Sequence, residues 1–293
     1  MKKQLLERVE SDVEEIIDFL QGLIKKKSSN PPGDTREAIS YVSKFLEERE
    51  IEHRILRPDK EKPNIVSKIE FEKPGRNLTL NGHVDVFPVS DTEAWKHDPW
   101  SGVLENGRIY GRGACDMKAG VTALVYTFII LSELSEKLSG SITLTVVSDE
   151  ETGGRLGSGW LIENIPEVRG DCCINAEPSS PHTIRFGEKG ILWFKVSIHA
   201  PGAHGAYTHL SFLSPLFHTH LSSNPIKIAA KIISDLENLK NLPVKHPKTL
   251  AETLKEGRQE AEIALGSGGF NVMSNISVNF GVINGGIKKQ HDT

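Results

Sequence analysis

The hydrophobic and polar positions of the chain follow two periods, which predict alternating helices and strands. Apolar residues recur at helical spacing in 5–24, and residues 117–134 are apolar enough to predict a buried helix. Shorter helices are predicted at 34–50 and 156–164. Short apolar or β-branched runs predict strands at 51–56, 64–70, 77–85, 141–148 and 171–176. This order is typical of an α/β fold with a mostly parallel sheet flanked by helices.

The pattern changes near residue 183. Residues 184–200 alternate between apolar and polar as a half-exposed strand does, and an amphipathic helix is predicted at 225–240. A last strand is predicted at 275–283. We therefore expect two domains, 1–183 and 184–293.

Composition and charge narrow the class of protein. The chain has 293 residues, of which 38% are hydrophobic and 25% charged, as in an ordinary globular protein. A chain this long can bury a core without a metal or disulfide, so a metal site would serve function. The net charge of -4 gives no basic surface for nucleic acid or an anionic membrane.

Cysteine usage and the apolar runs predict a cytoplasmic protein. Cys115, Cys172 and Cys173 form no C-x-x-C pair, which suits a reducing compartment. The N-terminus has no apolar run of signal-peptide length, and the longest apolar stretch, 121–131, is too short to span a bilayer.

Histidine and acidic residues follow several predicted strands, where α/β proteins bind ligands. His83 and Asp85 point to one face, so the carboxylate can support a metal-bound imidazole, although a hydrogen-bonded histidine at a strand end is commoner. Asp116 follows Gly111-Arg-Gly113, where its charge disfavours a phosphate. Asp116 could instead bridge two cations, or equally it could be a helix N-cap.

Three consecutive acids follow the strand predicted at 141–148. Glu150 and Glu151, next to Asp149, would repel each other unless a cation lies nearby. One of the pair could bind a metal while the other acts as a general base, with a solvated acidic turn as the alternative. Glu177 follows the next strand, where a surface glutamate before a proline is the commoner case.

Taken in order, these motifs resemble the M20 family of co-catalytic metallohydrolases, which includes aminoacylases, acetylornithine deacetylase, succinyl-diaminopimelate desuccinylase and carboxypeptidase-like members. The resemblance spans nearly the whole chain. It rests on Asn81-Gly-His-Val-Asp-Val-Phe-Pro88, Trp95-Lys-His-Asp-Pro-Trp-Ser-Gly102, Gly107-Arg-Ile-Tyr-Gly-Arg-Gly-Ala-Cys-Asp-Met-Lys-Ala-Gly120, Asp149-Glu-Glu-Thr-Gly-Gly154 and Ala176-Glu-Pro178.

The resemblance implies a zinc-exopeptidase-like catalytic domain and two zinc ions, which cobalt or manganese can replace. His83, Asp116 and Glu177 would hold one zinc, and Asp116 would bridge to a second zinc held by Glu151. Glu150 would be the general base, and Asp85 would steady His83. The reaction would be hydrolysis of amide bonds in N-acyl amino acids or small peptides, with the deacylase branch favoured by Gly-Arg-Gly-Ala-Cys-Asp-Met-Lys.

The resemblance also implies that 184–293 is part of a ferredoxin-like α/β domain, which serves as a lid and forms a homodimer. His204, in Gly-Ala-His-Gly, would reach the partner's active site and steady the oxyanion. The family pattern continues beyond Gly285-Gly286 to a last zinc-binding histidine, and His291 lacks the expected context. We therefore expect a C-terminally truncated enzyme with weakened or lost activity. The alternative is a catalytically inactive metal-binding or dimerising remnant, and a nucleotide-binding protein is disfavoured by Asp116.

Overall fold

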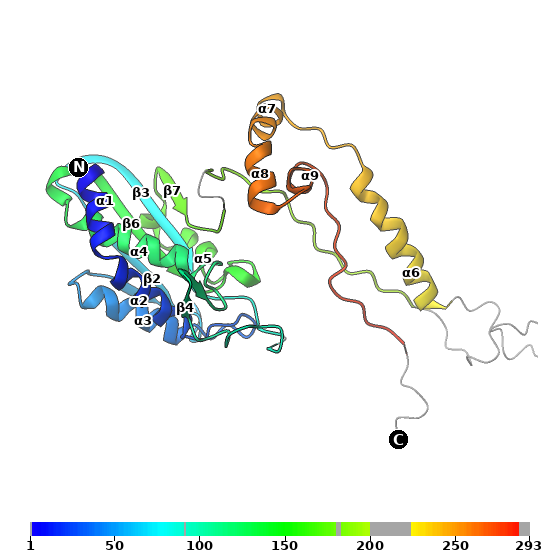
Figure 1. Ribbon diagram of the computed structural model, residues 1–293, viewed down its shortest axis with the longest axis horizontal. Helices are drawn as coiled ribbons and strands as arrows, with labels where there is room; N and C mark the ends of the chain where they lie inside the picture. Colours follow the sequence, from blue (N-terminus) through cyan, green and yellow to red (C-terminus); the bar gives the residue numbers. More distant parts are fainter. Residues whose placement is uncertain (1, 91, 180–182, 200–223, 287–293) are drawn as a thin grey trace, which may run out of the picture. The chain divides into compact units, whose positions relative to one another are not determined.

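The computed structural model describes residues 2–90, 92–179, 183–199 and 224–286 (Figure 1). The chain divides into two compact units, Met1–Pro178 and Ser179–Thr293, which are described separately below.

A five-stranded sheet forms the centre of the first unit, in the order β1-β2-β6-β3-β7. The strands are β1 (Arg54–Leu56), β2 (Asn64–Glu70), β3 (Lys73–His83), β6 (Ser139–Val147) and β7 (Cys172–Asn175). Strands β6, β3 and β7 are parallel, whereas β2 pairs antiparallel with both of its neighbours, β1 and β6. The sheet is therefore mixed, and the parallel arrangement predicted from the sequence holds for the three strands that lead to the acidic residues.

The register of the parallel strands determines which residues meet at their carboxyl ends. His83 at the end of β3 pairs with Val147 at the end of β6, and Asn81 pairs with Asn175 at the end of β7. The segments that follow β6 and β7 therefore leave the sheet on either side of His83, at the edge where α/β sheets bind ligands.

Three helices pack against one face of the sheet (Figure 1). They are α2 (Val13–Ile24), α3 (Arg36–Glu47) and α4 (Lys118–Ser132). Their apolar residues, such as Leu23, Val42 and Phe128, are buried against Leu80 and Leu144 of the sheet. Helix α4 is apolar on nearly all sides because it lies between the sheet and α2.

A smaller core covers the opposite face of the sheet. Val66 and Val147 point to this side and pack against Leu161 of α5 (Ser158–Asn164) and Val168 of the 3-10 helix η3 (Pro166–Val168). Their neighbours Ile65 and Val146 belong to the larger core, as the alternation of side chains along a strand requires. Both faces of the central strands are therefore buried.

The remaining elements of this unit are short or peripheral. The helix predicted at 5–24 is divided at Asp12 into α1 (Lys2–Ser11) and α2. Strands β4 (Val103–Glu105) and β5 (Arg108–Tyr110) form a hairpin whose turn residues, Asn106 and Gly107, both have positive φ. Two further 3-10 helices are η1 (Ser135–Lys137) and η2 (Glu150–Thr152).

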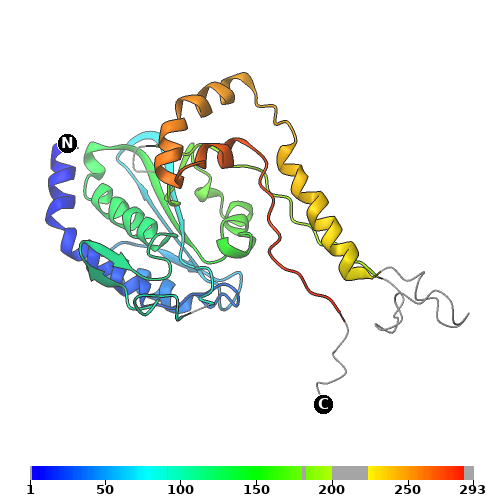
Figure 2. The ribbon, with the colours of Figure 1, turned by 45° about the vertical axis from the view of Figure 1, so that its right-hand side comes forward.

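In the described part of the second unit, the regular secondary structure is helical and lies between residues 225 and 274. It contains α6 (Pro225–Leu236), η5 (Glu237–Asn241), α7 (Lys248–Glu256), α8 (Arg258–Leu265) and α9 (Gly269–Ser274), of which α7, α8 and α9 follow one another closely in Figure 2. No helix in the described residues of either unit is long and apolar enough to cross a membrane.

The strands predicted at 184–200 and 275–283 are not formed in the described residues of these segments. Alternation predicts which side chains share a face, but a strand also needs a neighbour for its backbone N–H and C=O groups. No strand pairing involves these segments, and side chains such as Trp193 and Val282 are exposed. The prediction of two strands here was therefore wrong, and the ferredoxin-like arrangement of 184–293 stays a prediction.

Candidate metal centre

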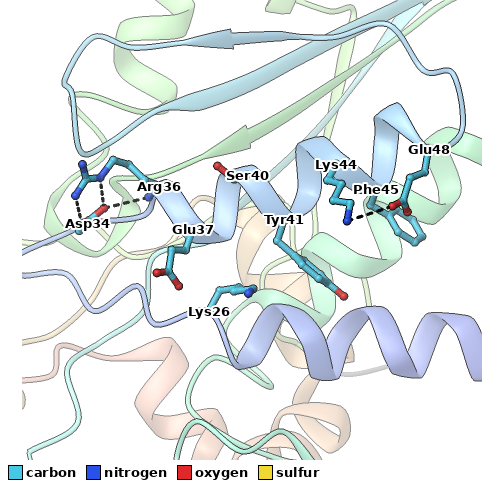
Figure 3. A pocket seen from close by; sticks show the side chains of 9 residues that line it. All are labelled: Lys26, Asp34, Arg36, Glu37, Ser40, Tyr41, Lys44, Phe45 and Glu48. Atoms are coloured by element: carbon cyan, nitrogen blue, oxygen red, sulfur yellow. Dashed lines mark hydrogen bonds and ion pairs between the residues drawn. The ribbon is translucent and has the colours of Figure 1, made fainter.

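A surface groove lies beside α3 (Figure 3). Its walls carry both charges, and two ion pairs lie within it: Arg36 with Asp34, and Lys44 with Glu48. The nine residues that line it are Lys26, Asp34, Arg36, Glu37, Ser40, Tyr41, Lys44, Phe45 and Glu48. None of the site residues predicted from the sequence is among them, so the groove is separate from the acidic edge of the sheet.

His83 lies at the centre of that acidic edge and is 2% exposed. Its Nδ1 atom is 2.8 Å from the main-chain oxygen of Asp85. Because a carbonyl oxygen only accepts hydrogen bonds, Nδ1 carries a proton and donates it. In the neutral ring the lone pair is then on Nε2, which is the tautomer that a metal ligand needs.

Three carboxylates surround the Nε2 atom of His83. The distances from Nε2 are 3.1 Å to Oε1 of Glu177, 3.3 Å to Oδ1 of Asp116 and 3.6 Å to Oε2 of Glu150. The acids come from three segments: the turn after β7, the residues before α4, and η2 after β6. Nε2 is nevertheless buried without a hydrogen-bond partner of good geometry in the described part of the chain.

Asp85 joins the end of β3 to the acidic turn. Its buried carboxylate accepts hydrogen bonds from the backbone N–H groups of Glu150 and Glu151, at 3.2 and 3.1 Å. One of its carboxylate oxygens is also 3.4 Å from Nδ1 of His83. The sequence predicted that Asp85 supports His83, and the shorter of its two contacts with the ring comes from its main-chain oxygen.

The electrostatics of the site reflect crowded negative charge. Burial raises the pKa of the Asp116, Glu150 and Glu151 carboxyls, and neighbouring carboxylates add to each shift, with Glu177 acting on Asp116 and Asp116 on Glu151. Burial alone would lower the pKa of His83, but the Asp85 and Glu177 carboxylates raise it to about 11. A divalent cation would relieve this repulsion.

The donor set fits a divalent metal ion. One ligand atom from each of His83, Glu150 and Glu177 lies within 4.8 Å of the others, and Asp116 lies against the same nitrogen. An imidazole with carboxylates is a ligand set used for zinc and other divalent transition metals. The buried Nε2 atom of His83, to which the described residues make no hydrogen bond, is the observation that favours a metal over a simple acidic surface.

The structure brings six of the seven predicted site residues to one edge of the sheet: His83, Asp85, Asp116, Glu150, Glu151 and Glu177. Glu150 was predicted as the general base and not as a ligand. In the structure it nevertheless lies among the carboxylates around Nε2 of His83, together with Glu177 and Asp116. The seventh, His204, lies outside the described residues. Its role stays a prediction.

Two residues on the other side of Asp85, Asn30 and Lys62, were not among the site residues predicted from the sequence. In the structure Nδ2 of Asn30 donates to Oδ2 of Asp85 at 2.8 Å, and Lys62 contacts both Asn30 and Asp149. The one feature of the sequence that could have pointed to Asn30 is its place before two prolines, and that pattern is equally typical of an ordinary turn.

Comparison with known proteins connects this site to a family. The model of peptidase family M20/M25/M40 matches residues 79–291. A succinyl-diaminopimelate desuccinylase of Wolbachia pipientis subsp. Culex pipiens is 31% identical over 231 residues, which are 77% of this chain and 54% of the relative. An uncharacterised metallohydrolase of Methanocaldococcus jannaschii is 33% identical over 215 residues, 66% of this chain and 52% of the relative.

The fold has solved counterparts as well. An M20 family metallo-carboxypeptidase from Sulfolobus solfataricus superposes with a TM-score of 0.59 at 22% identity, covering 84% of this chain and 56% of that chain. This likeness supports the α/β zinc-exopeptidase-like fold. The chain spans about half the length of the curated relatives it matches. Because the family model covers most of the chain and includes every described metal-site residue, the chain belongs to peptidase family M20/M25/M40.

Proposed function

We propose that this protein is a zinc-dependent hydrolase of amide bonds in N-acyl amino acids or small peptides, on the deacylase branch of its family. The observation that carries the proposal is the convergence of Asp116, Glu150 and Glu177 on the buried Nε2 atom of His83, to which the described residues make no hydrogen bond. A metal-dependent hydrolase needs a cation site beside a proton acceptor, and this edge of the sheet supplies residues for both.

His83, Asp116 and Glu177 would hold one cation, and Glu151 together with Asp116 would hold a second. When bound, two divalent cations supply Lewis-acid polarisation of the scissile carbonyl and make water a nucleophile near neutral pH. Support for the shared role of Asp116 is its contact with His83 and its electrostatic effect on Glu151.

Glu150 would act as general base and then as general acid. It would accept a proton from the attacking water and return that proton to the leaving amine. The raised pKa of Glu150, caused mainly by burial, suits this exchange because a carboxyl group whose pKa lies nearer to neutrality can both accept and release a proton near neutral pH. Its backbone is fixed by Asp85, which keeps the carboxylate at the site.

The finer assignments rest on the relatives. Support for a deacylase comes from the name of the Wolbachia relative, a succinyl-diaminopimelate desuccinylase. We further propose that His204 contributes to an oxyanion site across a homodimer, that the protein works in the cytoplasm, and that residues 1–183 are the catalytic domain and 184–293 the lid.

The test is hydrolysis by the full chain, purified without metal and then supplied with zinc or cobalt. The substrates are succinyl-diaminopimelate, N-acetyl amino acids and dipeptides, and release of the free amine is measured. We expect metal-dependent release, fastest on an N-acyl substrate. Bound metal without release from any substrate would contradict the hydrolase and favour the metal-binding remnant.

Two variants complete the experiment. Glu150→Gln removes the proposed base and should lower kcat by about 100- to 10,000-fold. Glu163→Gln is the matched control, since Glu163 is an exposed glutamate on α5. If the two variants hydrolyse the substrate equally fast, Glu150 is not the base.

A further inference from the structure

The loop that follows α2 lies along the end of β3, on both sides of Asp85. The hydroxyl of Ser28 donates to the main-chain oxygen of Val84 at 2.6 Å, and the main-chain oxygen of Ser28 accepts a hydrogen bond from the N–H of Val86 at 3.0 Å. The N–H of Asn30 in turn donates to the oxygen of Val86 at 2.9 Å. These bonds fix the loop so that the side chain of Asn30 reaches the carboxylate of Asp85.

Asn30 uses both ends of its buried amide. Its Nδ2 atom donates to Oδ2 of Asp85 at 2.8 Å and to Oγ1 of Thr152 at 2.9 Å. Its Oδ1 atom accepts from Nζ of Lys62 at 3.2 Å. An aspartate could not donate to Asp85 and an apolar residue could do neither, so only an amide satisfies both neighbours.

Lys62 connects this amide to the acidic turn. Its ammonium lies 3.0 Å from Oδ1 of Asp149, and Asp149 also accepts bonds from Thr152 and from the N–H of Leu156. Gly33 leaves room for the lysine, because a Cβ there would lie 2.3 Å from Cε of Lys62. The side chains of Lys62 and Asp149 are 15% and 5% exposed, so their ion pair is largely shielded from water.

We propose that Asn30, held in place by Lys62, is a positioning residue for the metal centre. The inference rests on the function proposed above. Asn30 holds the carboxylate of Asp85, and that carboxylate holds the backbone of Glu150 and Glu151. The main-chain oxygen of the same Asp85 holds the ring of His83. A shift of Asp85 would therefore move a histidine and two glutamates relative to one another.

The experiment measures cobalt(II) binding to the full chain by its visible absorption spectrum, because the band positions report the ligand geometry. Asn30→Ala and Lys62→Met are the test variants, and the second keeps the lysine's aliphatic stem. We expect each to weaken cobalt binding by about 10- to 100-fold, as loss of an outer-shell partner does, and to change the spectrum of the saturated protein. Lys62→Arg keeps the cation and should restore most of the binding.

Matched controls separate positioning from general damage. Asn77→Ala removes an asparagine from the interior of β3, where Nδ2 contacts the main-chain oxygen of Glu167. Lys68→Met removes a lysine of β2 that pairs with Glu70. Urea unfolding is followed for every variant. We expect the controls to bind cobalt with the wild-type spectrum, whatever their stability.

The outcomes for this inference and for the proposed function differ. Wild-type spectra and affinities in both Asn30→Ala and Lys62→Met would overturn the positioning role and leave the metal hydrolase intact. A wild-type chain that binds no cobalt would overturn the metal site itself. Should Asn30→Ala fail to fold, Lys62→Met and its arginine counterpart decide the question.

Discussion

The Nε2 atom of His83 and the Oε1 atom of Glu177 lie 3.1 Å apart, although the two residues come from different strands of the sheet. His83 ends β3, and Glu177 follows the adjacent parallel strand β7. Parallel pairing therefore brings the two side chains to one edge. The contact leaves Nε2 facing carboxylates from three separate segments, which is the geometry on which the proposed metal centre depends.

His83→Asn tests the role of the imidazole as a ligand. Loss of an outer-shell residue already costs about 10- to 100-fold in metal affinity, so removal of Nε2 should cost more than about 100-fold. The change would be measured by competition with a coloured zinc chelator. His53→Asn is the matched control, because His53 is also largely buried and contacts Ser43 and the backbone of Ile51. Equal zinc affinity in the two variants would contradict the assignment.

Glu150 and Glu151 are adjacent, yet we predict opposite effects of their substitution. Glu150→Gln should keep both metal ions and lose turnover, whereas Glu151→Gln should lose one of the two ions. The reason is that Glu151 lies near Asp116, the proposed bridging ligand: burial raises the pKa of Glu151, and the nearby charge of Asp116 adds to the shift. Metal content measured after dialysis distinguishes the variants. If Glu150→Gln loses a metal ion and Glu151→Gln keeps both, the two residues have the opposite roles. The test can distinguish these cases because Glu150 also lies close to Nε2 of His83.

Gly120 sets the distance between α4 and the segment that carries Glu177. A Cβ at this position would lie 2.3 Å from the main-chain oxygen of Ala176 and 3.0 Å from its Cβ. Gly120→Ala should therefore displace Ala176 and weaken metal binding, and it should cost about 1–3 kcal/mol of unfolding free energy as overpacking does. Urea unfolding and cobalt titration measure the two effects.

Gly257→Ala is the control for that prediction. A Cβ at Gly257 would meet its nearest neighbour, the oxygen of Thr253, at an ordinary 3.5 Å. It should leave both stability and cobalt binding near their wild-type values. If Gly120→Ala behaves in the same way, the close approach of α4 to Ala176 does not set the position of Glu177.

Tyr126 gives a pH dependence that is independent of the metal centre. Burial raises the pKa of its phenol, and the charge of Glu15 adds to the shift. Above a pH of about 10 the folded state keeps a proton that the unfolded state loses, so the free energy of unfolding falls as the pH rises. Tyr126→Phe should lose this dependence and become the more stable protein at high pH.

The measurement for Tyr126 is urea unfolding of both proteins at pH 8 and pH 10.5. Near pH 8 the variant should be at least as stable as the wild type, because the hydroxyl that it loses is buried without a hydrogen-bond partner among the described residues. At pH 10.5 the variant should gain relative to the wild type, by at most about 1.4 kcal/mol per pH unit above the unfolded pKa. Parallel pH profiles would show that the phenol is not shielded as the structure indicates.

The sequence predicted the sheet and its acidic edge because local patterns determine both. The runs that became β3, β6 and β7 carry short stretches of apolar or β-branched residues, and His83, Glu150 and Glu177 lie at or just beyond their ends. Once parallel strands are predicted, their carboxyl ends must meet. Chain order alone therefore anticipated the convergence, although it did not give the distances or the division of roles.

Other features depend on contacts between distant segments, which a single sequence does not reveal. Asn30 and Lys62 become relevant only because the loop after α2 packs along β3 beside the turn of Asp149. The alternation of apolar and polar residues in 184–200 shows which side chains would share a face of a strand. It does not show whether a neighbouring strand is present to pair with the backbone. The interruption at Asp12 was not predicted either, because the apolar residues keep their helical spacing on both sides of it.

The central claim is that His83, Asp116 and Glu177 share one cation and that Asp116 with Glu151 holds a second. The most direct measurement is anomalous X-ray diffraction from crystals of the full chain grown with cobalt. We predict two neighbouring peaks with Asp116 between them, one against Nε2 of His83 and the other against the Glu151 carboxylate. A peak remote from His83, or none at this edge of the sheet in cobalt-loaded crystals, would contradict the claim.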